Sequence, residues 1–278
     1  MQNVICFGSG GGANRLYRQI SNKYNILGFT DNDSNKIGGK IFSSPIYSVE
    51  ECLKLHYEKI IITSAPGLDS IKKQLLAMGI DEGMIDDSFV VAPLESRRIF
   101  LERLSQMQRD IDSNICVAEA GVFEGDFAKY INCYYPNREL FLFDTFEGFC
   151  DKDIEKEMTM SNAKVGDYSN TSEEIVLSKM QFKEKCKIFK GYFPQTAKNI
   201  DKMFCFVNLD LDLYEPTYNG LVFFEKKMVN HGIILVHDYF ADNFKGPKEA
   251  VDKFITEKKG KYIALPIGDG ISVMVVGF

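Results

Sequence analysis

Short apolar runs recur along the chain, and glycine or acidic residues follow them. In the second half these runs lie at 115–118, 140–143, 204–209 and 233–236. Each is nearly continuous in hydrophobic side chains, which is typical of strands in parallel sheets that helices cover on both faces. The mixed polar and apolar segments between the runs suit the crossover helices that a parallel sheet requires. The pattern therefore predicts an α/β fold with a mostly parallel sheet.

The first 92 residues repeat this alternation on a smaller scale. Their apolar runs lie at 4–7, 26–29 and 60–63, and the first is followed by a segment that suits a helix. Strand, helix and strand in this order again predict a parallel sheet. The chain has 278 residues, which is long enough for two domains at about 150 residues each. We therefore expect a small Rossmann-like domain at 1–92.

A charged segment separates the two sets of runs. Its apolar residues are Leu94, Ile99, Leu101, Leu104 and Met107. Apolar residues among charges in this way indicate an amphipathic helix. We therefore place a connecting helix at 93–113 and the second domain at 114–278. Two apolar runs around Gly268-Asp269-Gly270 predict that this domain closes with an antiparallel hairpin.

Composition excludes several classes of protein. The chain has 33 Lys+Arg against 39 Asp+Glu, a net charge of −6, and no basic block that could follow a phosphate backbone. No apolar run approaches the roughly 20 residues that span a bilayer, and the first residues lack the pattern of a signal peptide. We expect a soluble, cytoplasmic protein with a small-molecule substrate and no nucleic-acid or membrane partner. A homo-oligomer is compatible with all of this.

The turn after the first run of the second domain contains Gly121 and Gly125, and a helix-like segment follows it. Glycines at a strand-to-helix turn let a ligand approach the backbone near the helix N-terminus. The next run ends at Asp144, 144 − 121 = 23 residues after Gly121, which is about the offset of an acid that binds a ribose. The alternative is that the glycines only permit tight packing and that Asp144 caps the next turn.

The third and fourth runs of this domain end in a set of acidic residues. Asp210 and Asp212 alternate with leucines, so that a strand would point both carboxylates the same way. Neighbouring carboxylates are costly unless protons or a cation compensate their charge. The fourth run ends in His237 and Asp238, on what we expect to be an adjacent strand. These residues predict an oxygen-rich site for a hard divalent cation, although each one alone could be a solvated acid or a cap.

The turn after the very first run also has a nucleotide-like pattern. Gly8 and Gly10 begin a glycine-rich stretch that ends at Ala13, and Asp31 follows after 31 − 13 = 18 residues. No hydride-transfer residues accompany this turn. We keep three interpretations of this domain: binding a nucleotide or another part of the substrate, binding a dinucleotide, and a structural or oligomerisation role.

The second domain resembles the TylF/macrocin-type O-methyltransferase family. The matching stretches, in order, are VAEAGVFEGDFAKYIN, LFLFDTFEGF, SNTSEEIVLSKM, KGYFPQTA, FCFVNLDLDLYEPTYNGLVFF, GIILVHDY and FKGPKEAVDKF. The resemblance implies a class I methyltransferase fold, S-adenosylmethionine as methyl donor, Mg²⁺ or another divalent cation, and a hydroxyl acceptor that is commonly on a sugar. The stretch Gly-Phe-Thr-Asp-Asn-Asp in the first domain resembles the small Rossmann-like domain at the front of nucleotide-sugar-modifying acetyltransferases.

The resemblance also implies roles for particular residues. It assigns to the cofactor Glu119, Gly121, Val122, Gly125, Asp144, Thr145, Asp167 and Ser172. Its metal acids fall on Asp210 and on the pair His237 and Asp238, with Asp212 as general base. In the family this pair is Asp-Asp, so His237 is a departure and is interpreted as a weak ligand, a group behind the ligands or an alternative base.

We therefore expect a methyltransferase that acts on a nucleotide-linked sugar or a glycan precursor, for a surface polysaccharide or a natural-product glycoside. Two alternatives stay open at this point. One is the same chemistry on a hydroxyl that does not belong to a sugar. The other is a protein that binds a nucleotide sugar and S-adenosylmethionine without turnover, although cofactor binding alone would need none of the acidic residues.

Overall fold

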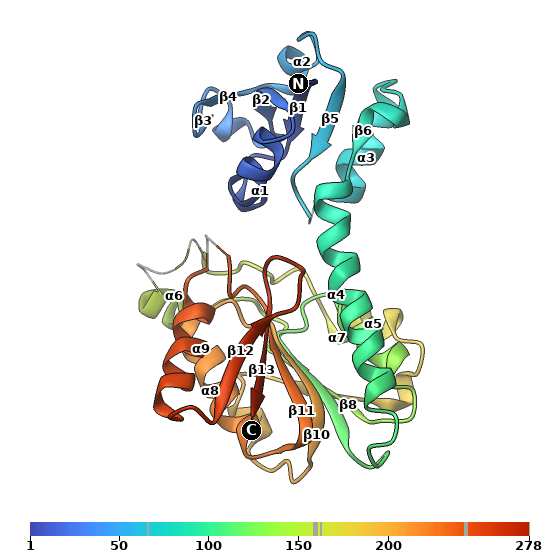
Figure 1. Cartoon of the computed structure of the whole chain (residues 1–278), viewed down its shortest axis with the longest axis vertical. Helices are drawn as coiled ribbons and strands as arrows, with labels where there is room; N and C mark the ends of the chain where they lie inside the picture. The colour runs from blue at the N-terminus through green and yellow to red at the C-terminus, as the bar shows by residue number, and fades with distance from the viewer. Residues whose placement is uncertain (66, 158–160, 162, 242–243, 278) are drawn as a thin grey trace. The chain divides into compact units, whose positions relative to one another are not determined.

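The structure is a computed structural model that describes residues 1–65, 67–157, 161, 163–241 and 244–277. It divides into two units, Met1–Glu95 and Ser96–Phe278 (Figure 1). Both units have a mostly parallel sheet with helices, so the expected α/β fold is confirmed. None of the described helices is both long and apolar enough to cross a lipid bilayer.

The first unit contains a six-stranded sheet in the order β3-β4-β2-β1-β5-β6. Its strands are β1 (Asn3–Phe7), β2 (Asn25–Thr30), β3 (Lys40–Ile41), β4 (Ser44–Tyr47), β5 (Lys59–Ile62) and β6 (Ile85–Asp86). Its helices are α1 (Gly11–Ser21), α2 (Val49–Cys52) and α3 (Leu68–Ala77), with 3₁₀ turns η1 (Ser34–Lys36) and η2 (Glu82–Met84). Alternate residues of β1 face opposite sides: Val4 packs with α1, and Ile5 packs with α3.

The second unit contains a seven-stranded sheet in the order β12-β13-β11-β10-β7-β8-β9. Its strands are β7 (Cys116–Ala120), β8 (Leu140–Asp144), β9 (Cys186–Lys190), β10 (Phe204–Leu209), β11 (Met228–Val236), β12 (Tyr262–Pro266) and β13 (Val273–Gly277). The shorter elements are α5 (Ala128–Tyr134), α6 (Asp151–Glu157), α7 (Glu173–Lys179), α8 (Tyr214–Glu225), α9 (Gly246–Glu257), η3 (Lys183–Lys185) and η4 (Gln195–Ala197). Strands β12 and β13 form the expected antiparallel hairpin, and β13 is antiparallel to β11.

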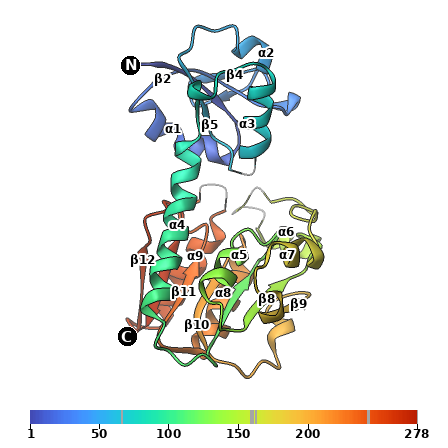
Figure 2. The same ribbon diagram turned by 90° about the vertical axis from the view of Figure 1, so that its right-hand side faces the viewer.

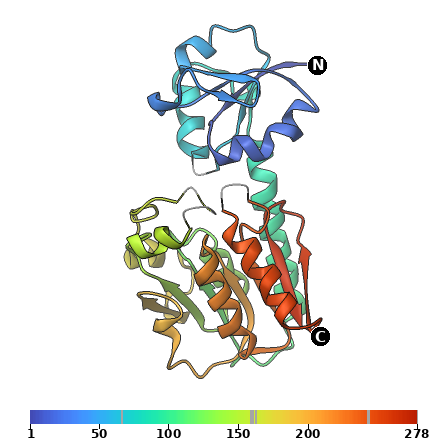
Figure 3. The same cartoon turned by 90° about the vertical axis from the view of Figure 1, so that its left-hand side faces the viewer.

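Helices cover both faces of this second sheet. Helices α8 and α9 lie on one face (Figure 3), where Phe224 and Phe254 pack against residues of β7 and β10. Helix α5 and the C-terminal part of α4 (Ser88–Met107) lie on the other face (Figure 2), where Ile131 and Leu101 belong to a second buried cluster. Burial on both faces explains why the strands are nearly continuous in apolar side chains.

The connecting helix differs from the sequence expectation in its bounds and in its buried face. Helix α4 begins at Ser88 and ends at Met107, with Pro93 inside it, instead of spanning 93–113. Leu101 and Leu104 are buried as expected, whereas Leu94, Ile99 and Met107 are exposed. A helix on the surface of a sheet buries only the side chains of one face, so the apolar residues on its other faces stay in solvent.

Two further details of the second sheet differ from expectation. Strand β9 was not expected, because its sequence CKIFK mixes lysines with apolar residues, as suits its position at the sheet edge. Strand β10 ends at Leu209, so Asp210 and Asp212 follow the strand instead of alternating within it. Asp212 has φ +58°, and the chain turns there into α8.

Candidate active site

The strand order of the second unit creates a topological switch point at β7. Strand β7 pairs in parallel with β10 on one side and with β8 on the other. From β7 the chain runs outward through β8 and β9, and it then crosses to β10 on the other side of β7. Ligands of open parallel sheets bind at such a switch point, outside the carboxyl ends of the strands. Gly121 follows β7 and Asp210 follows β10, so both lie at these carboxyl ends.

Gly121 is required by the close approach of the two strand ends. Its φ is +82°, and a Cβ atom there would lie 1.8 Å from the carbonyl oxygen of Asp210. Any side chain would therefore be both strained and in collision with backbone. The glycine turn and the acidic segment after β10 are thus in direct contact, which the sequence pattern did not show.

The carboxylate of Asp144 is engaged by the chain's own amides. Its Oδ2 accepts hydrogen bonds from the N–H groups of Val122 and Phe123 at 2.7 and 2.9 Å, and its Oδ1 accepts one from Phe146 at 2.8 Å. These bonds fix the glycine turn to the end of β8. Each carboxylate oxygen can accept two hydrogen bonds, so Oδ1 retains capacity for a ligand hydroxyl. The ribose contact stays a prediction.

Glu119 and Asn208 form a buried pair across β7 and β10. Asn208 Nδ2 donates to Glu119 Oε1 at 2.7 Å, while Glu119 Oε2 and Asn208 Oδ1 have no hydrogen-bond partner among the described residues. Burial raises the pKa of Glu119 to about 8, against the lowering effect of the Asn208 hydrogen bond. At neutral pH the protonated Glu119 offers Oε2 as a donor and Asn208 offers Oδ1 as an acceptor, and these two buried atoms suit polar groups of a ligand.

The other residues expected at the cofactor have local structural roles. Ser172 is the N-cap of α7 and accepts from the amide of Ile175, and Asp167 Oδ2 accepts from the amide of Lys164 at 2.8 Å. Gly125 has φ +79° and lies against Val176. Thr145 lines a pocket of about 600 Å³ beside the ends of β8 and β9, whose lining also includes Glu147, Cys150, Lys190 and Tyr192.

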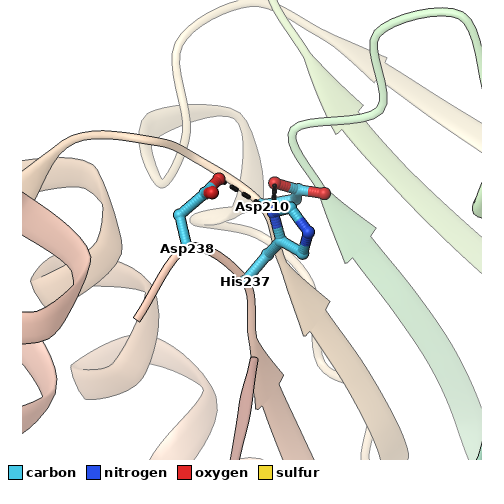
Figure 4. A group of neighbouring side chains, drawn as sticks. All are labelled: Asp210, His237 and Asp238. Carbon is cyan, nitrogen blue, oxygen red and sulfur yellow. Dashed lines mark hydrogen bonds and ion pairs between the residues drawn. The ribbon is translucent and has the colours of Figure 1, made fainter. Parts of the chain in front are cut away.

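The acidic residues after β10 and β11 converge around one imidazole (Figure 4). His237 Nδ1 lies 3.0 Å from Asp210 Oδ1 and 2.8 Å from Asp238 Oδ2. Potential ligand atoms of these three side chains all lie within 4.8 Å of one another. We call Asp210, His237 and Asp238 the acidic cluster. Carboxylates only accept hydrogen bonds, so Nδ1 carries a proton and donates it between the two acids.

The charges of the cluster shift one another's titration. Burial alone would lower the pKa of His237, but Asp210 and Asp238 outweigh it and raise this pKa to about 10. Burial would raise the pKa of Asp238, but the charge and hydrogen bond of His237 hold it below its usual value. Burial, Asp238 and Asp210 together raise the pKa of Asp212 well above its usual value. Asp212 therefore belongs to the same electrostatic group.

Two residues near the cluster were not singled out from the sequence. Arg97 of α4 places Nη1 3.7 Å from Asp210 Oδ2. Tyr168 has φ +63°, and its ring contacts those of Phe123 and Phe149. Burial and then the charge of Asp212 raise the pKa of Tyr168, so this hydroxyl is a neutral donor beside the acids. The sequence assigned the neighbouring Asp167 and Ser172 to the cofactor, and no pattern in it indicated a role for the tyrosine between them.

The cluster fits a divalent cation that accepts nitrogen as well as oxygen. Its donor set is two carboxylates and one imidazole nitrogen, which lie close enough together to share one cation. Mg²⁺ strongly prefers oxygen ligands, whereas Mn²⁺ and later divalent metals also bind imidazole. His237 can become a ligand through Nδ1 only after its proton leaves, so a cation and a proton compete for the same atom.

The glycine-rich turn of the first unit holds its acid internally. Asp31 Oδ2 accepts from the amide and the hydroxyl of Ser9 at 2.8 and 2.6 Å, and Lys36 Nζ lies 3.1 Å away. Burial would raise the pKa of Asp31, but these partners lower it to about 2. Gly8 and Gly10 flank Ser9, so this contact organises the turn. A nucleotide contact of Asp31 stays a prediction.

Comparison with known proteins gives two family matches and a common fold. Residues 101–272 match the family model of macrocin-O-methyltransferase (TylF), and residues 1–85 match the model described as C2185-like, N-terminal. The O-methyltransferase NovP is 19% identical, with a TM-score of 0.52 over 64% of this chain and 78% of NovP. CalS11, a calicheamicin methyltransferase, is 18% identical, with a TM-score of 0.55 over 76% of this chain and 93% of CalS11. No curated protein matched.

Proposed function

Because the chain belongs to the macrocin-O-methyltransferase family and is an S-adenosylmethionine-dependent O-methyltransferase, we propose that it methylates a sugar hydroxyl with the help of a divalent cation. The observation that carries this proposal is the contact between the glycine turn after β7 and the acidic segment after β10. The turn suits the methyl donor, and the acidic cluster beside it suits an acceptor with several hydroxyl groups, because carboxylates accept hydrogen bonds.

On the donor side, Gly121 leaves the turn open to a close approach by the cofactor. We assign Val122, Gly125, Thr145, Asp167 and Ser172 to the walls and backbone of this subsite. Glu119 Oε2, which has no partner among the described residues, suits a polar group of the donor's methionine part, and Asp144 Oδ1 has capacity for a ribose hydroxyl. A bound donor would thereby use hydrogen-bonding capacity that the described residues leave unfilled.

On the acceptor side, we assign Asp212 as the general base. Asp212 lies beside Asp210 and Asp238, whose charges together with burial raise its pKa; the positive charge of a bound cation would offset these carboxylates and leave Asp212 ionised to accept the alcohol proton. His237 already carries a proton on Nδ1 between Asp210 and Asp238 and is therefore a poorer acceptor. The base role belongs to the carboxylate in preference to the imidazole.

Asp210 and Asp238 would hold the divalent cation, with His237 Nδ1 as a third ligand once it is deprotonated. When bound, the cation supplies positive charge that lowers the pKa of a coordinated hydroxyl. Asp210 and Asp238 orient the site, and Asp212 takes the proton. Asp210→Asn and Asp212→Asn should each reduce methyl transfer at least about a hundredfold, with the affinity for S-adenosylmethionine changed less than about twofold.

For the first unit we propose a role in binding the nucleotide part of the acceptor. Gly10 is the N-cap of α1, and nothing lies within 4 Å of a Cβ built there, so its backbone suits the approach of an anion; Gly8 N–H already donates to the carbonyl oxygen of Thr30, and Asp31 is engaged by Ser9. The acceptor would then be a nucleotide-linked sugar, a precursor of a surface polysaccharide or a glycoside. We retain the division into a substrate-binding unit, a connecting helix and a methyltransferase unit as part of this proposal.

The deciding experiment measures transfer of labelled methyl from S-adenosylmethionine to a panel of nucleotide sugars, with and without chelator. We expect transfer to at least one member, loss of transfer on chelation, and its return with Mn²⁺. Transfer to a phenol or an aglycone alone would overturn the sugar assignment. Transfer that survives complete chelation would overturn the cation assignment, while leaving the sugar assignment intact.

A further inference from the structure

Arg97 is a buried cation that the proposed chemistry does not use. It lies on α4, four residues before Leu101, seven before Leu104 and eleven before Gln108, which is the spacing of one helical face. The side chain of Arg97 is 11% exposed, and the other three residues are buried. Arg97 therefore continues the stripe by which α4 packs on the second sheet, where an apolar residue would be expected.

The packing of α4 holds the position of Arg97. Leu101 and Leu104 belong to the buried cluster of this face, and Gln108 Nε2 donates to the carbonyl oxygen of Cys205 on β10 at 2.9 Å. The guanidinium lies 4.3 Å from the centre of the Phe127 ring, a cation–π contact that restrains its plane. The charged group is thus attached to a rigid part of the unit.

The hydrogen bonds of this guanidinium are incomplete. Its Nη1 is buried and has no hydrogen-bond partner within the described part of the chain. It faces Asp210 Oδ2 at 3.7 Å, while the other oxygen of the same carboxylate, Oδ1, lies 3.0 Å from His237 Nδ1. Asp210 is therefore contacted on each oxygen by a nitrogen atom, Arg97 Nη1 at Oδ2 and His237 Nδ1 at Oδ1. Desolvating a guanidinium is costly unless its charge is used.

We propose that Arg97 is a positioning residue for Asp210, and that its charge weakens the affinity of the acidic cluster for a divalent cation. The fixed guanidinium restrains the Oδ2 side of the carboxylate and so directs Oδ1 toward the cluster. Its positive charge also repels a second cation, with little screening because the site is largely buried. This inference rests on the proposed function of the cluster. Residue 97 precedes the family match at 101–272.

The test compares three full-length variants: Arg97→Met, Arg97→Lys and Arg103→Met. Methionine is close in length to the arginine stem and has no charge. Lysine restores the charge without the planar fork. Arg103 is exposed on the same helix and donates to Gln106, so its replacement removes an equal charge away from the cluster. The probes are Mn²⁺ binding by electron paramagnetic resonance, S-adenosylmethionine binding, and kcat with the acceptor that wild type uses.

For Arg97→Met we expect Mn²⁺ to bind about tenfold more tightly, because one nearby positive charge is gone, while kcat falls at least about tenfold because Asp210 is no longer held. Affinity for S-adenosylmethionine should change less than about twofold. Arg97→Lys should return the Mn²⁺ affinity close to wild type and restore kcat only in part. Arg103→Met should behave as wild type in all three measurements.

Opposite changes in metal affinity and kcat distinguish this role from loss of structure, which would weaken both. Unchanged Mn²⁺ affinity in Arg97→Met, or an unchanged kcat, overturns the inference. A parallel loss of metal binding, cofactor binding and kcat that Arg97→Lys fully restores also overturns it, because it indicates a packing role. If wild type binds no Mn²⁺, the cation part of the proposed function fails, and kcat of the three variants decides the positioning role.

Discussion

At the scale of single residues, the site depends on which species occupies one nitrogen atom. His237 Nδ1 shares a proton between Asp210 and Asp238, at distances that also suit ligands of one cation. The resemblance to the family implies an aspartate at this position, which would supply an oxygen instead. For the proposed cation, we therefore expect histidine at 237 to favour a metal that accepts nitrogen and to couple metal binding to proton release.

His237→Asp should increase the affinity for Mg²⁺ about tenfold, because three carboxylates suit a hard cation better than two and an imidazole. It should also abolish the proton release that accompanies metal binding by wild type near neutral pH. Titration calorimetry in buffers of different ionisation enthalpy measures both quantities. His56→Asp, at an exposed position of the first unit, is the control and should change neither. Equal proton release by wild type and His237→Asp would contradict the shared role of Nδ1.

Gly121→Ala should destabilise the protein by about 3 kcal/mol or more, because the new Cβ combines positive φ with a collision against the carbonyl oxygen of Asp210. The displaced segment carries Asp210, so methyl transfer should fall as well. Gly270→Ala is the control: its φ is +75°, and nothing lies within 4 Å of the added Cβ. It should cost only the conformational strain, about 1 kcal/mol. Chemical denaturation compares the two, and equal losses would show that the contact does not matter.

At the scale of elements, one narrow stripe of buried side chains on α4 packs against the second sheet and stabilises the helix there. Leu101 and Leu104 are buried against the sheet, whereas Ile99 of the same helix is 43% exposed. Gln108 extends the stripe with hydrogen bonds from Nε2 to the carbonyl oxygens of Cys205 and His231. The geometry around Arg97 depends on this packing rather than on intrinsic helix propensity.

Leu101→Ala should lower the free energy of unfolding by about 3 kcal/mol, because it leaves a cavity against β7 and α5. Ile99→Ala should change it by less than about 1 kcal/mol, because the side chain is half in solvent. Circular dichroism during urea unfolding measures both values. A cost for Ile99→Ala as large as that for Leu101→Ala would place the buried stripe on a different face of α4.

At the scale of the whole molecule, proton binding couples the site to stability. Glu119, with pKa about 8, and His237, with pKa about 10, both hold protons more tightly when the chain is folded than ordinary side chains do. At pH values between the unfolded and the folded pKa of each group, the folded state therefore carries more protons than the unfolded state. This contribution to stability is present below the unfolded pKa values and is lost as pH rises through the folded ones.

The free energy of unfolding should therefore decrease between pH 5 and 9 in the metal-free protein. Glu119 contributes up to about 1.4 kcal/mol per pH unit between its unfolded value, about 4.3, and its folded value. Glu119→Gln removes this titration and should flatten the slope in that range. Asn208 can still hydrogen-bond the new amide oxygen. A slope that Glu119→Gln leaves unchanged would show that this carboxyl is not protonated in the folded state.

Sequence patterns predicted the elements that local chemistry decides. Buried strands had to be nearly continuous in apolar residues, so β7, β8 and β10 were expected close to their observed positions, whereas β11 begins at Met228, before the expected run at 233–236. The edge strand β9 was missed because half-exposed strands have no such pattern. The expected alternation of Asp210 and Asp212 was wrong, because the chain leaves the strand at Leu209 and turns at a positive φ.

The sequence by itself determined that glycine and acidic residues follow buried strands and that a histidine, His237, stands among them. Only the tertiary structure decided which of these residues meet, because strand order is not written in any single strand. It placed β7 between β8 and β10, pressed Gly121 against Asp210, and brought Arg97 to the acidic cluster from a helix that was interpreted as a linker. The physical reason is that charges and backbone contacts act across space, and distant segments come together only when the sheet and its covering helices pack.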